Sequence, residues 1–341
     1  MDASVGLGIF YHLLGALAAA SFYIPVKLVK NWEWEASWLV NGIASWLIMP
    51  LLVSSLLLPN VLTFFLAIPP QVAAKTFVFG ALWGLGGLTF GMTLRYLGLS
   101  VGYGVAIGIT LVVGTLTPPL LNGTLMTLFT HASGLMALAG VAIAVVGIAL
   151  TTLAGQKKER SKGVQNSELN VRKGVAIAIF CGITSAFMAF AIDAAGPIQA
   201  MALAAGVDPL YQVMPGYVII MLGGFVTNAI YCLYQAKRHH TFAKIRRDPS
   251  HFWRNVMLSA TGGVIWYMQF FFYGWGHVQM SAVNLAFVSW TFHMSMLVLC
   301  GGLWGLILKE WRNSGRAPLS YQLAGMLVIV LSTFIIGIGG S

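Results

Sequence analysis

Long apolar runs follow one another along the chain, separated by short polar or helix-breaking segments such as Pro69-Pro70, Asn122-Gly123 and Pro318. About 20 apolar residues are enough for one helical crossing of a bilayer, and hydropathy locates such spans directly. The pattern predicts an all-α integral membrane protein with ten transmembrane helices, at residues 5–29, 36–58, 72–94, 100–121, 134–154, 173–194, 210–236, 254–275, 282–308 and 318–339.

The composition supports this class. The chain is 58% hydrophobic and only 8% charged, whereas about 25% of the residues of an ordinary soluble domain are charged. The net charge of +10 comes from cations in short loops between apolar runs, so it indicates membrane topology rather than binding of nucleic acid. We therefore expect a lipid bilayer as a partner and no nucleic acid. The three cysteines lie within apolar runs and imply no disulfide framework.

The distribution of lysine and arginine predicts the orientation. One side of the predicted helices carries only Lys75, and the loops on the other side carry the remaining 18 of the 19 Lys and Arg residues. The positive-inside rule places those basic loops in the cytoplasm and both termini in the periplasm. The first apolar run lacks the charged segment that precedes it in a signal peptide, so we expect it to remain as a helix.

A polar stretch at Gln156–Asn170 divides five predicted spans from five. An odd number of crossings in each half inverts the second half relative to the first, an arrangement found in many secondary transporters. The sequence thus predicts two inverted five-helix repeats, residues 1–155 and 173–341, joined by a basic cytoplasmic linker at 156–172. Glycines four residues apart, such as Gly80 and Gly84, favour close helix packing.

No enzyme motif is present. The sequence contains no GxSxG, no HExxH and no Walker loop, and its glycine-rich runs lie inside apolar helices. The lack of an ATP-binding module argues against a primary pump. We predict that the chain is not an enzyme and that it uses no cofactor and no metal.

The segment Gly262–Leu308 combines two apolar runs with polar and aromatic residues, and it contains no Asp, Glu, Lys or Arg. Polar groups in hydrocarbon are costly unless they face a partner or a cavity. Trp266, Gln269 and Tyr273 share one face of a helix by their spacing. This segment therefore predicts a polar, aromatic wall inside a membrane protein.

Sugars are bound by aromatic faces together with a few polar side chains. The predicted substrate-binding residues combine these two kinds of side chain, and they are Trp266, Gln269, Tyr273, Asn284, Ser289, Trp290, Tyr23, Trp83 and Thr89. The alternative for each Trp or Tyr is a place in the core or in the interfacial belt. For the threonines, the alternative is a hydrogen bond to the backbone of their own helix.

Coupling to protons requires a group that changes charge near the working pH. The candidates within the predicted spans are His293, Asp193 and His12, and His277 lies at a span end. Histidine titrates in this range unaided, and burial brings a carboxyl group into it. The alternatives are a neutral imidazole hydrogen-bonded in the core for His293, and an interfacial position at a helix end for Asp193.

The chain resembles the bacterial L-rhamnose–proton symporter family, within the drug/metabolite transporter superfamily. The resemblance is carried by GIFYHLLG at Gly8–Gly15, GVAIGITLVVGT at Gly104–Thr115, VDPLY at Val207–Tyr211, WYMQFFFYGWGH at Trp266–His277, SWTFHMS at Ser289–Ser295 and LKEW at Leu308–Trp311. It implies import of L-rhamnose with a proton across the bacterial inner membrane, by alternating access of a ten-helix fold.

Two features differ from this resemblance. Met280–Phe287 carries no carboxylate, and Asp193 stands where a neutral amide is expected. Because of these two differences, we expect the substrate to be either L-rhamnose or a closely related deoxy sugar. An exporter of metabolites or drugs on the same scaffold and a sensor that binds sugar without transport remain alternatives, and no oligomeric state is predicted.

Overall fold

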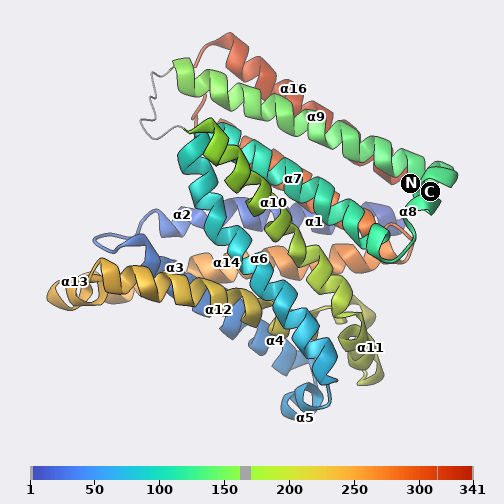
Figure 1. Cartoon of the computed structure of the whole chain (residues 1–341), viewed down its shortest axis with the longest axis horizontal. Coiled ribbons are helices and arrows are strands. Elements are labelled where there is room, and N and C mark those ends of the chain that lie inside the picture. The colour runs from blue at the N-terminus through green and yellow to red at the C-terminus, as the bar shows by residue number, and fades with distance from the viewer. Residues whose placement is uncertain (1–2, 162–169, 313, 340–341) are drawn as a thin grey trace. The chain divides into compact units, whose positions relative to one another are not determined.

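The computed structural model describes residues 3–161, 170–312 and 314–339 (Figure 1). Residues 162–169 of the predicted linker and the last residues at both ends of the chain lie outside this set. None of the described residues lies in a strand, which agrees with the predicted all-α class.

The helices follow the predicted spans, with additional short helices between them. They are α1 (Ala3–Ser21), α2 (Tyr23–Val26), α3 (Trp34–Gly42), α4 (Met49–Leu57), α5 (Val61–Leu66), α6 (Pro70–Leu97), α7 (Leu99–Leu121), α8 (Leu125–Thr130), α9 (Ala132–Ser161), α10 (Val171–Ala194), α11 (Gly196–Ala204), α12 (Met214–Arg238), α13 (Thr241–Arg247), α14 (Phe252–Ser281), α15 (Ser289–Ile307) and α16 (Arg316–Gly339). The sequence predicted the long helices and placed loops where α5, α8, α11 and α13 lie.

Within the described ranges, nine helical segments are long and apolar enough to cross a membrane. They correspond to nine of the ten predicted spans, and α14 is the exception. This helix is 30 residues long, but polar side chains and the weakly hydrophobic rings of tryptophan and tyrosine interrupt its apolar character. The multi-span helical architecture is therefore confirmed, whereas the count of ten stays a prediction.

The second predicted span is interrupted by a π-helical segment, Ile43–Ile48, between α3 and α4. Pro50, at the start of α4, has no N–H to donate to the carbonyl group four residues earlier. A wider π turn is a usual way for a helix to accommodate such a break. The sequence predicted the length of this span, residues 36–58, but not its interruption.

The chain divides into two compact units, and each contains segments from both predicted repeats. Unit 1 comprises Met1–Leu17, Gly86–Phe190 and Trp275–Ser341, and unit 2 comprises Ala18–Leu85 and Ala191–Gly274. Helices α1, α6, α10 and α14 contribute one end to each unit.

In unit 1, α9 and α16 lie side by side along most of their length (Figure 1). The buried face of α9 is rich in glycine and alanine. A Cβ atom on Gly325 of α16 would lie 2.8 Å from the backbone oxygen of Gly147 and 2.9 Å from the backbone nitrogen of Thr151. Small residues therefore let the two backbones touch, as is typical of helix pairs in membranes.

In unit 2, α12 packs against α3, α4 and the first part of α6. Gly80 and Gly84 are the contact points on α6, because a Cβ atom at either position would overlap the backbone of Ile220 or Gly224 on α12. This pair thus marks a close helix contact, as its spacing predicts, whereas a Cβ atom at Gly87 or Gly91, which are also four residues apart, would meet nothing within 4 Å.

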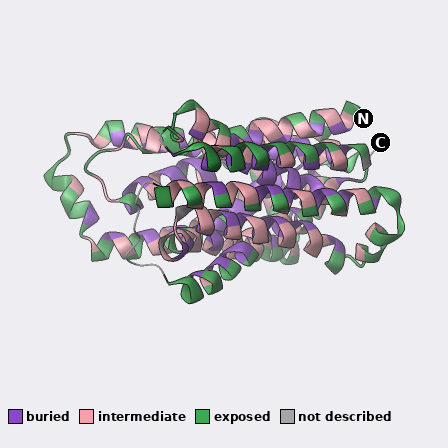
Figure 2. Ribbon diagram, turned by 90° about the horizontal axis from the view of Figure 1, so that it is seen from above, coloured by how far each residue is buried: buried purple, intermediate pink, exposed green. Residues whose placement is uncertain are grey.

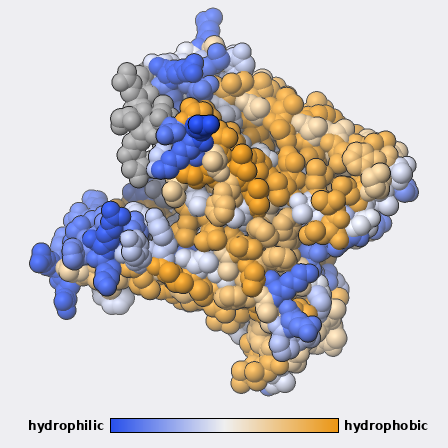
Figure 3. All heavy atoms as spheres, viewed as in Figure 1, coloured by the Kyte–Doolittle hydropathy of each residue, from blue (hydrophilic) through white to orange (hydrophobic). Residues whose placement is uncertain are grey.

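Buried and exposed residues alternate along individual helices (Figure 2), so one face of each helix is covered by its neighbours. The uncovered faces are apolar: Leu56, Leu66 and Leu327 are at least 70% exposed. Hydrophobic residues cover the sides of the helices in the space-filling view, and hydrophilic residues gather over α13 (Figure 3). Apolar outer faces on this scale are suited to contact with lipid.

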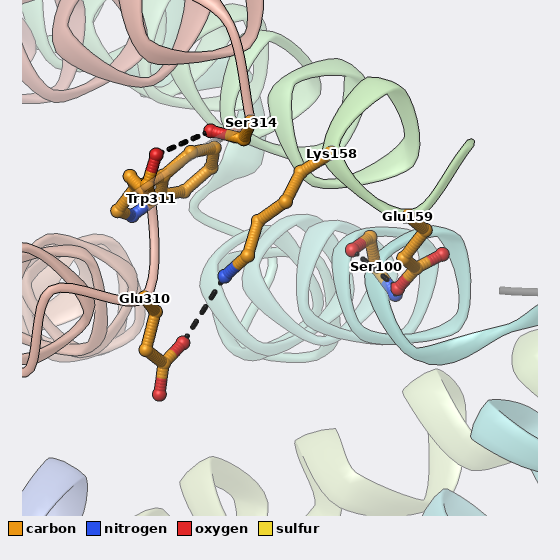
Figure 4. Close-up of polar contacts among 6 residues, drawn as sticks. All are labelled: Ser100, Lys158, Glu159, Glu310, Trp311 and Ser314. Carbon is orange, nitrogen blue, oxygen red and sulfur yellow. Dashed lines mark hydrogen bonds and ion pairs between the residues drawn. The ribbon is translucent and has the colours of Figure 1, made fainter. Parts of the chain in front are cut away.

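Charged residues tie the end of α9 to its neighbours in unit 1 (Figure 4). Glu159 accepts hydrogen bonds from the backbone N–H of Ser100, 3.0 Å away, and from its hydroxyl group, 2.8 Å away, and so caps the start of α7. Lys158 lies 3.2 Å from the Glu310 carboxylate and 4.6 Å from the centre of the Trp311 ring. These contacts hold α7, α9 and the turn before α16 together.

Replacement of Gly325 by valine is expected to destabilise the protein by about 1–3 kcal/mol, because the new side chain has no room between α9 and α16. Thermal unfolding in detergent measures this effect. Gly301→Val is the matched control, since nothing lies within 4 Å of a Cβ atom at Gly301. Equal melting temperatures for the two variants would contradict the close contact.

Candidate functional site

Four tryptophans and a phenylalanine form an aromatic cluster in unit 2, made of Trp38, Trp46, Trp83, Trp266 and Phe270. The ring of Trp46 lies 5.3 Å from that of Trp266 and 5.8 Å from that of Trp83. The centres of Trp266 and Phe270 are 5.0 Å apart, and Trp38 lies 6.0 Å from Trp46. Two predicted substrate-binding residues, Trp83 and Trp266, are thus brought together at 5.7 Å.

Asn228 of α12 fixes this cluster from one side. Its side-chain oxygen accepts a hydrogen bond from the Trp38 indole at 3.0 Å, and its amide group donates to the backbone oxygens of Gly84 and Gly224. The amide is therefore fully used in holding α3, α6 and α12. The indole N–H of Trp46, in contrast, is buried and has no hydrogen-bond partner within the described residues.

Several polar side chains lie next to the aromatic cluster along α14 and α12. Gln269 is only 6% exposed, and Tyr273 is also buried. Tyr217 is fully buried with its ring 6.0 Å from Phe270. The hydroxyl groups of Tyr217 and Tyr267 find no hydrogen-bond partner among the described atoms. Buried donors without partners are uncommon in folded proteins and point to a ligand or to water.

The other two predicted residues of unit 2 do not join the aromatic cluster. Tyr23 is 50% exposed, and the Lys27 ammonium group lies 5.7 Å from the centre of its ring. Asp193 is exposed near the end of α10. Its position matches the alternative of a carboxylate at a helix end.

Two buried histidines form a second group, in unit 1. The ring of His12 on α1 lies 6.5 Å from that of His293 on α15, and it stacks on Phe292 at 6.0 Å. Both histidines are fully buried. Gly276 makes room for this pair, because a Cβ atom there would lie 2.9 Å from three atoms of the His12 ring. The structure thus brings together two of the three predicted proton-coupling residues.

Trp290 and the hydroxyl groups around it hold α15 against α7. The Trp290 indole donates to the backbone oxygen of Thr110 at 3.1 Å, so its N–H is used by the protein itself. The hydroxyl groups of Thr115 and Thr291 are 2.6 Å apart. The Ser289 hydroxyl is buried and has no hydrogen-bond partner in the described part of the chain.

The remaining predicted residues of unit 1 have simpler surroundings. The Thr89 hydroxyl donates to the backbone oxygen of Gly86 at 3.2 Å, which is the expected alternative of a bond within its own helix. Asn284 is exposed and has a left-handed backbone with φ of 60°. Asparagine tolerates this conformation better than most residues, so Asn284 has a structural role in the turn before α15.

Sequence reasoning missed a cluster of ionisable groups in unit 2. Ligand-type atoms of Glu33, Glu35 and His239 lie within 4.8 Å of one another. Glu35 already accepts hydrogen bonds from His239 and Thr241, and Glu33 pairs with Lys244 at 2.5 Å. Protein donors therefore occupy this cluster, which we interpret as an ion-pair network rather than a metal site. The predicted second span began at residue 36, so Glu35 was placed in a loop.

Just beyond this network, the loop between α13 and α14 is fixed by Asp248. Hydrogen bonds from the hydroxyl and backbone N–H of Ser250, and from the Asn31 side chain, lower the pKa of Asp248. The carboxylate is fully exposed, so its role is to order the loop.

Comparison with known proteins identifies the family of this chain. The family model described as L-rhamnose-proton symport protein (RhaT) matches residues 1–341. The chain belongs to this family. It is 46% identical to the L-rhamnose-proton symporter of Escherichia coli (strain K12 / DH10B) over 342 residues, covering 99% of both chains. It is 47% identical to the L-rhamnose-proton symporter of Shigella boydii serotype 18, with the same coverage. The L-rhamnose-proton symport family is a family of transporters rather than enzymes. The resemblance to this family is confirmed, whereas the placement in the drug/metabolite transporter superfamily stays a prediction.

Replacement of Gly276 by alanine is expected to displace the His12 ring, because the added methyl group would overlap it. The histidine signals in the NMR spectrum of a 15N-histidine-labelled sample report this displacement. Gly108→Ala is the control, since a Cβ atom at Gly108 meets nothing within 4 Å. Unchanged histidine signals in Gly276→Ala would show that α14 does not press on His12.

Proposed function

We propose that the chain imports L-rhamnose together with a proton across the bacterial inner membrane by alternating access. The observation that carries this proposal is the match over 99% of both chains to relatives named L-rhamnose-proton symporters. The apolar outer faces of the helices support a location in a lipid bilayer. A transporter of this kind requires a sugar-binding surface and a group that takes up and releases protons.

The aromatic cluster of unit 2 is the proposed sugar-binding surface. Indole rings stack on the C–H faces of a sugar, and L-rhamnose adds a methyl group that suits an apolar contact. The N–H of Trp46 and the hydroxyl groups of Tyr217 and Tyr267 supply donors for sugar oxygens. Gln269, with both a donor and an acceptor, orients the hydroxyl groups of the substrate.

The pair of buried histidines in unit 1 is the proposed site of proton coupling. Two positive charges at 6.5 Å would repel strongly in a medium of low dielectric constant. The pair therefore holds no more than one proton at a time, which suits one coupled step. Asp193, which is exposed near the end of α10, stays the alternative.

We also propose that α14 is the tenth transmembrane helix and that residues 1–155 and 173–341 form two inverted repeats. Within unit 1, α9 contacts α16 and α7 contacts α15, and within unit 2, α3 and α4 contact α12. These partners occupy equivalent places in the two halves, which supports the repeat. From this ten-helix arrangement we also infer that the chain belongs to the drug/metabolite transporter superfamily and that both termini lie in the periplasm.

Uptake of labelled L-rhamnose into proteoliposomes tests the proposed function. An inward proton gradient is expected to drive accumulation above the external concentration, and a protonophore is expected to abolish it. Rhamnose entry that does not respond to the gradient would refute proton coupling. Absence of any rhamnose entry in vesicles that contain folded protein would refute the assignment of L-rhamnose as the substrate.

Replacement of Gln269 by alanine is expected to weaken L-rhamnose binding by about 1–3 kcal/mol, because substrate hydroxyl groups would lose a buried hydrogen-bond partner. Isothermal titration calorimetry or a tryptophan fluorescence titration measures the change. Gln199→Ala is the matched control, since Gln199 binds the backbone oxygen of Ile192 in unit 2. Unchanged affinity in Gln269→Ala would remove this residue from the site.

A further inference from the structure

Glu35 stands out among the acidic residues of the chain. It lies on the first turn of α3, at the end of a membrane-spanning segment, and its side chain is fully buried. Every other acidic side chain among the described residues is at least partly exposed. A buried carboxylate requires either full pairing or a proton.

The two oxygens of Glu35 have different surroundings. Oε1 accepts hydrogen bonds from the Thr241 hydroxyl at 2.5 Å and from Nδ1 of His239 at 3.1 Å. Oε2 is buried and has no hydrogen-bond partner within the described ranges. An ionised carboxylate with one unpaired buried oxygen is costly, and a proton on that oxygen removes the charge.

The backbone is shaped to bring both donors to Glu35. Helix α12 ends at Arg238, and His240 adopts a left-handed conformation with φ of 54°. This turn places His239 and Thr241, the residues on either side of it, against the same carboxylate. The His239 side chain is 37% exposed, so it connects the buried carboxylate to water.

The other charges near Glu35 are already balanced. Glu33 pairs with Lys244 at 2.5 Å on the exposed side of the cluster. Cys232, a buried thiol of α12, is a further titratable group close to Glu35. Protonation of Glu35 therefore depends mainly on His239 and Thr241.

We propose that Glu35 and His239 form a proton-binding site at the contact between α3 and the α12–α13 turn. This proposal rests on the proposed function as a proton symporter. A proton on the Glu35 carboxyl group converts the ion pair into a carboxylic acid beside the His239 imidazolium, with a weaker hold on the turn. The exposed imidazolium then gives a proton to water and takes the carboxyl proton at Nδ1, which restores the ion pair.

The position of the site indicates the direction in which the proton moves. Its neighbours are the basic loops, which the positive-inside rule places in the cytoplasm. The proton carried inward with the sugar is therefore released here, and the restored ion pair re-attaches α13 to α3. Glu35 with His239 thus handles the release of the proton.

Infrared difference spectroscopy of purified protein without sugar tests proton binding directly. Acidification is expected to produce a carboxylic C=O band in the wild type that is lost in Glu35→Gln and kept in Glu33→Gln, the matched control two residues away. His239→Gln keeps the carboxylate and is expected to shift the midpoint of this band by at least about one pH unit. A band unchanged in Glu35→Gln would overturn the proposal. If that variant does not fold, an unchanged midpoint in His239→Gln would overturn it.

The same variants in proteoliposomes test coupling. The ratio of gradient-driven accumulation to sugar exchange at equal pH is expected to fall about tenfold in Glu35→Gln and to stay unchanged in Glu33→Gln. An unchanged ratio in Glu35→Gln would contradict a role in proton release. Failure of the wild type to transport L-rhamnose would contradict the proposed function instead, and the spectroscopic result would still decide whether Glu35 binds a proton.

Discussion

The structure depends on one constraint: polar groups inside apolar helices must find partners within the protein, because the surrounding lipid offers none. Asn228 meets this constraint for three helices at once by bonding Trp38 and the backbone oxygens of Gly84 and Gly224. Trp290 does the same between α15 and α7. These contacts are fully used in holding the helices and leave no capacity for a substrate.

The few buried polar atoms that lack partners are therefore informative. In unit 2 they include the N–H of Trp46 and the hydroxyl groups of Tyr217 and Tyr267, around or next to the aromatic cluster. In the same unit, Oε2 of Glu35 lacks a donor beside an otherwise complete ion-pair network. The proposed sugar site uses the unpaired groups of Trp46, Tyr217 and Tyr267, and the proposed proton site uses Oε2 of Glu35.

The sequence predicted the helical class, the nine candidate membrane spans and the family, because hydropathy and long motif matches are local signals. It also singled out Trp83 with Trp266 and His12 with His293, which the fold brings together in pairs. It could not predict the places of Trp38 and Trp46 in the aromatic cluster, since these residues come from a distant part of the chain. Glu35 was missed because its burial is created by His239 and Thr241, more than 200 residues away.

Symport requires that sugar and proton cross the membrane together. The external pH of a weakly buffered suspension of proteoliposomes, with no gradient imposed, reports this when L-rhamnose is added outside. We expect alkalinisation that begins with sugar entry, is absent in vesicles without protein, and is abolished by a protonophore. Entry of labelled L-rhamnose with no change in external pH would contradict symport.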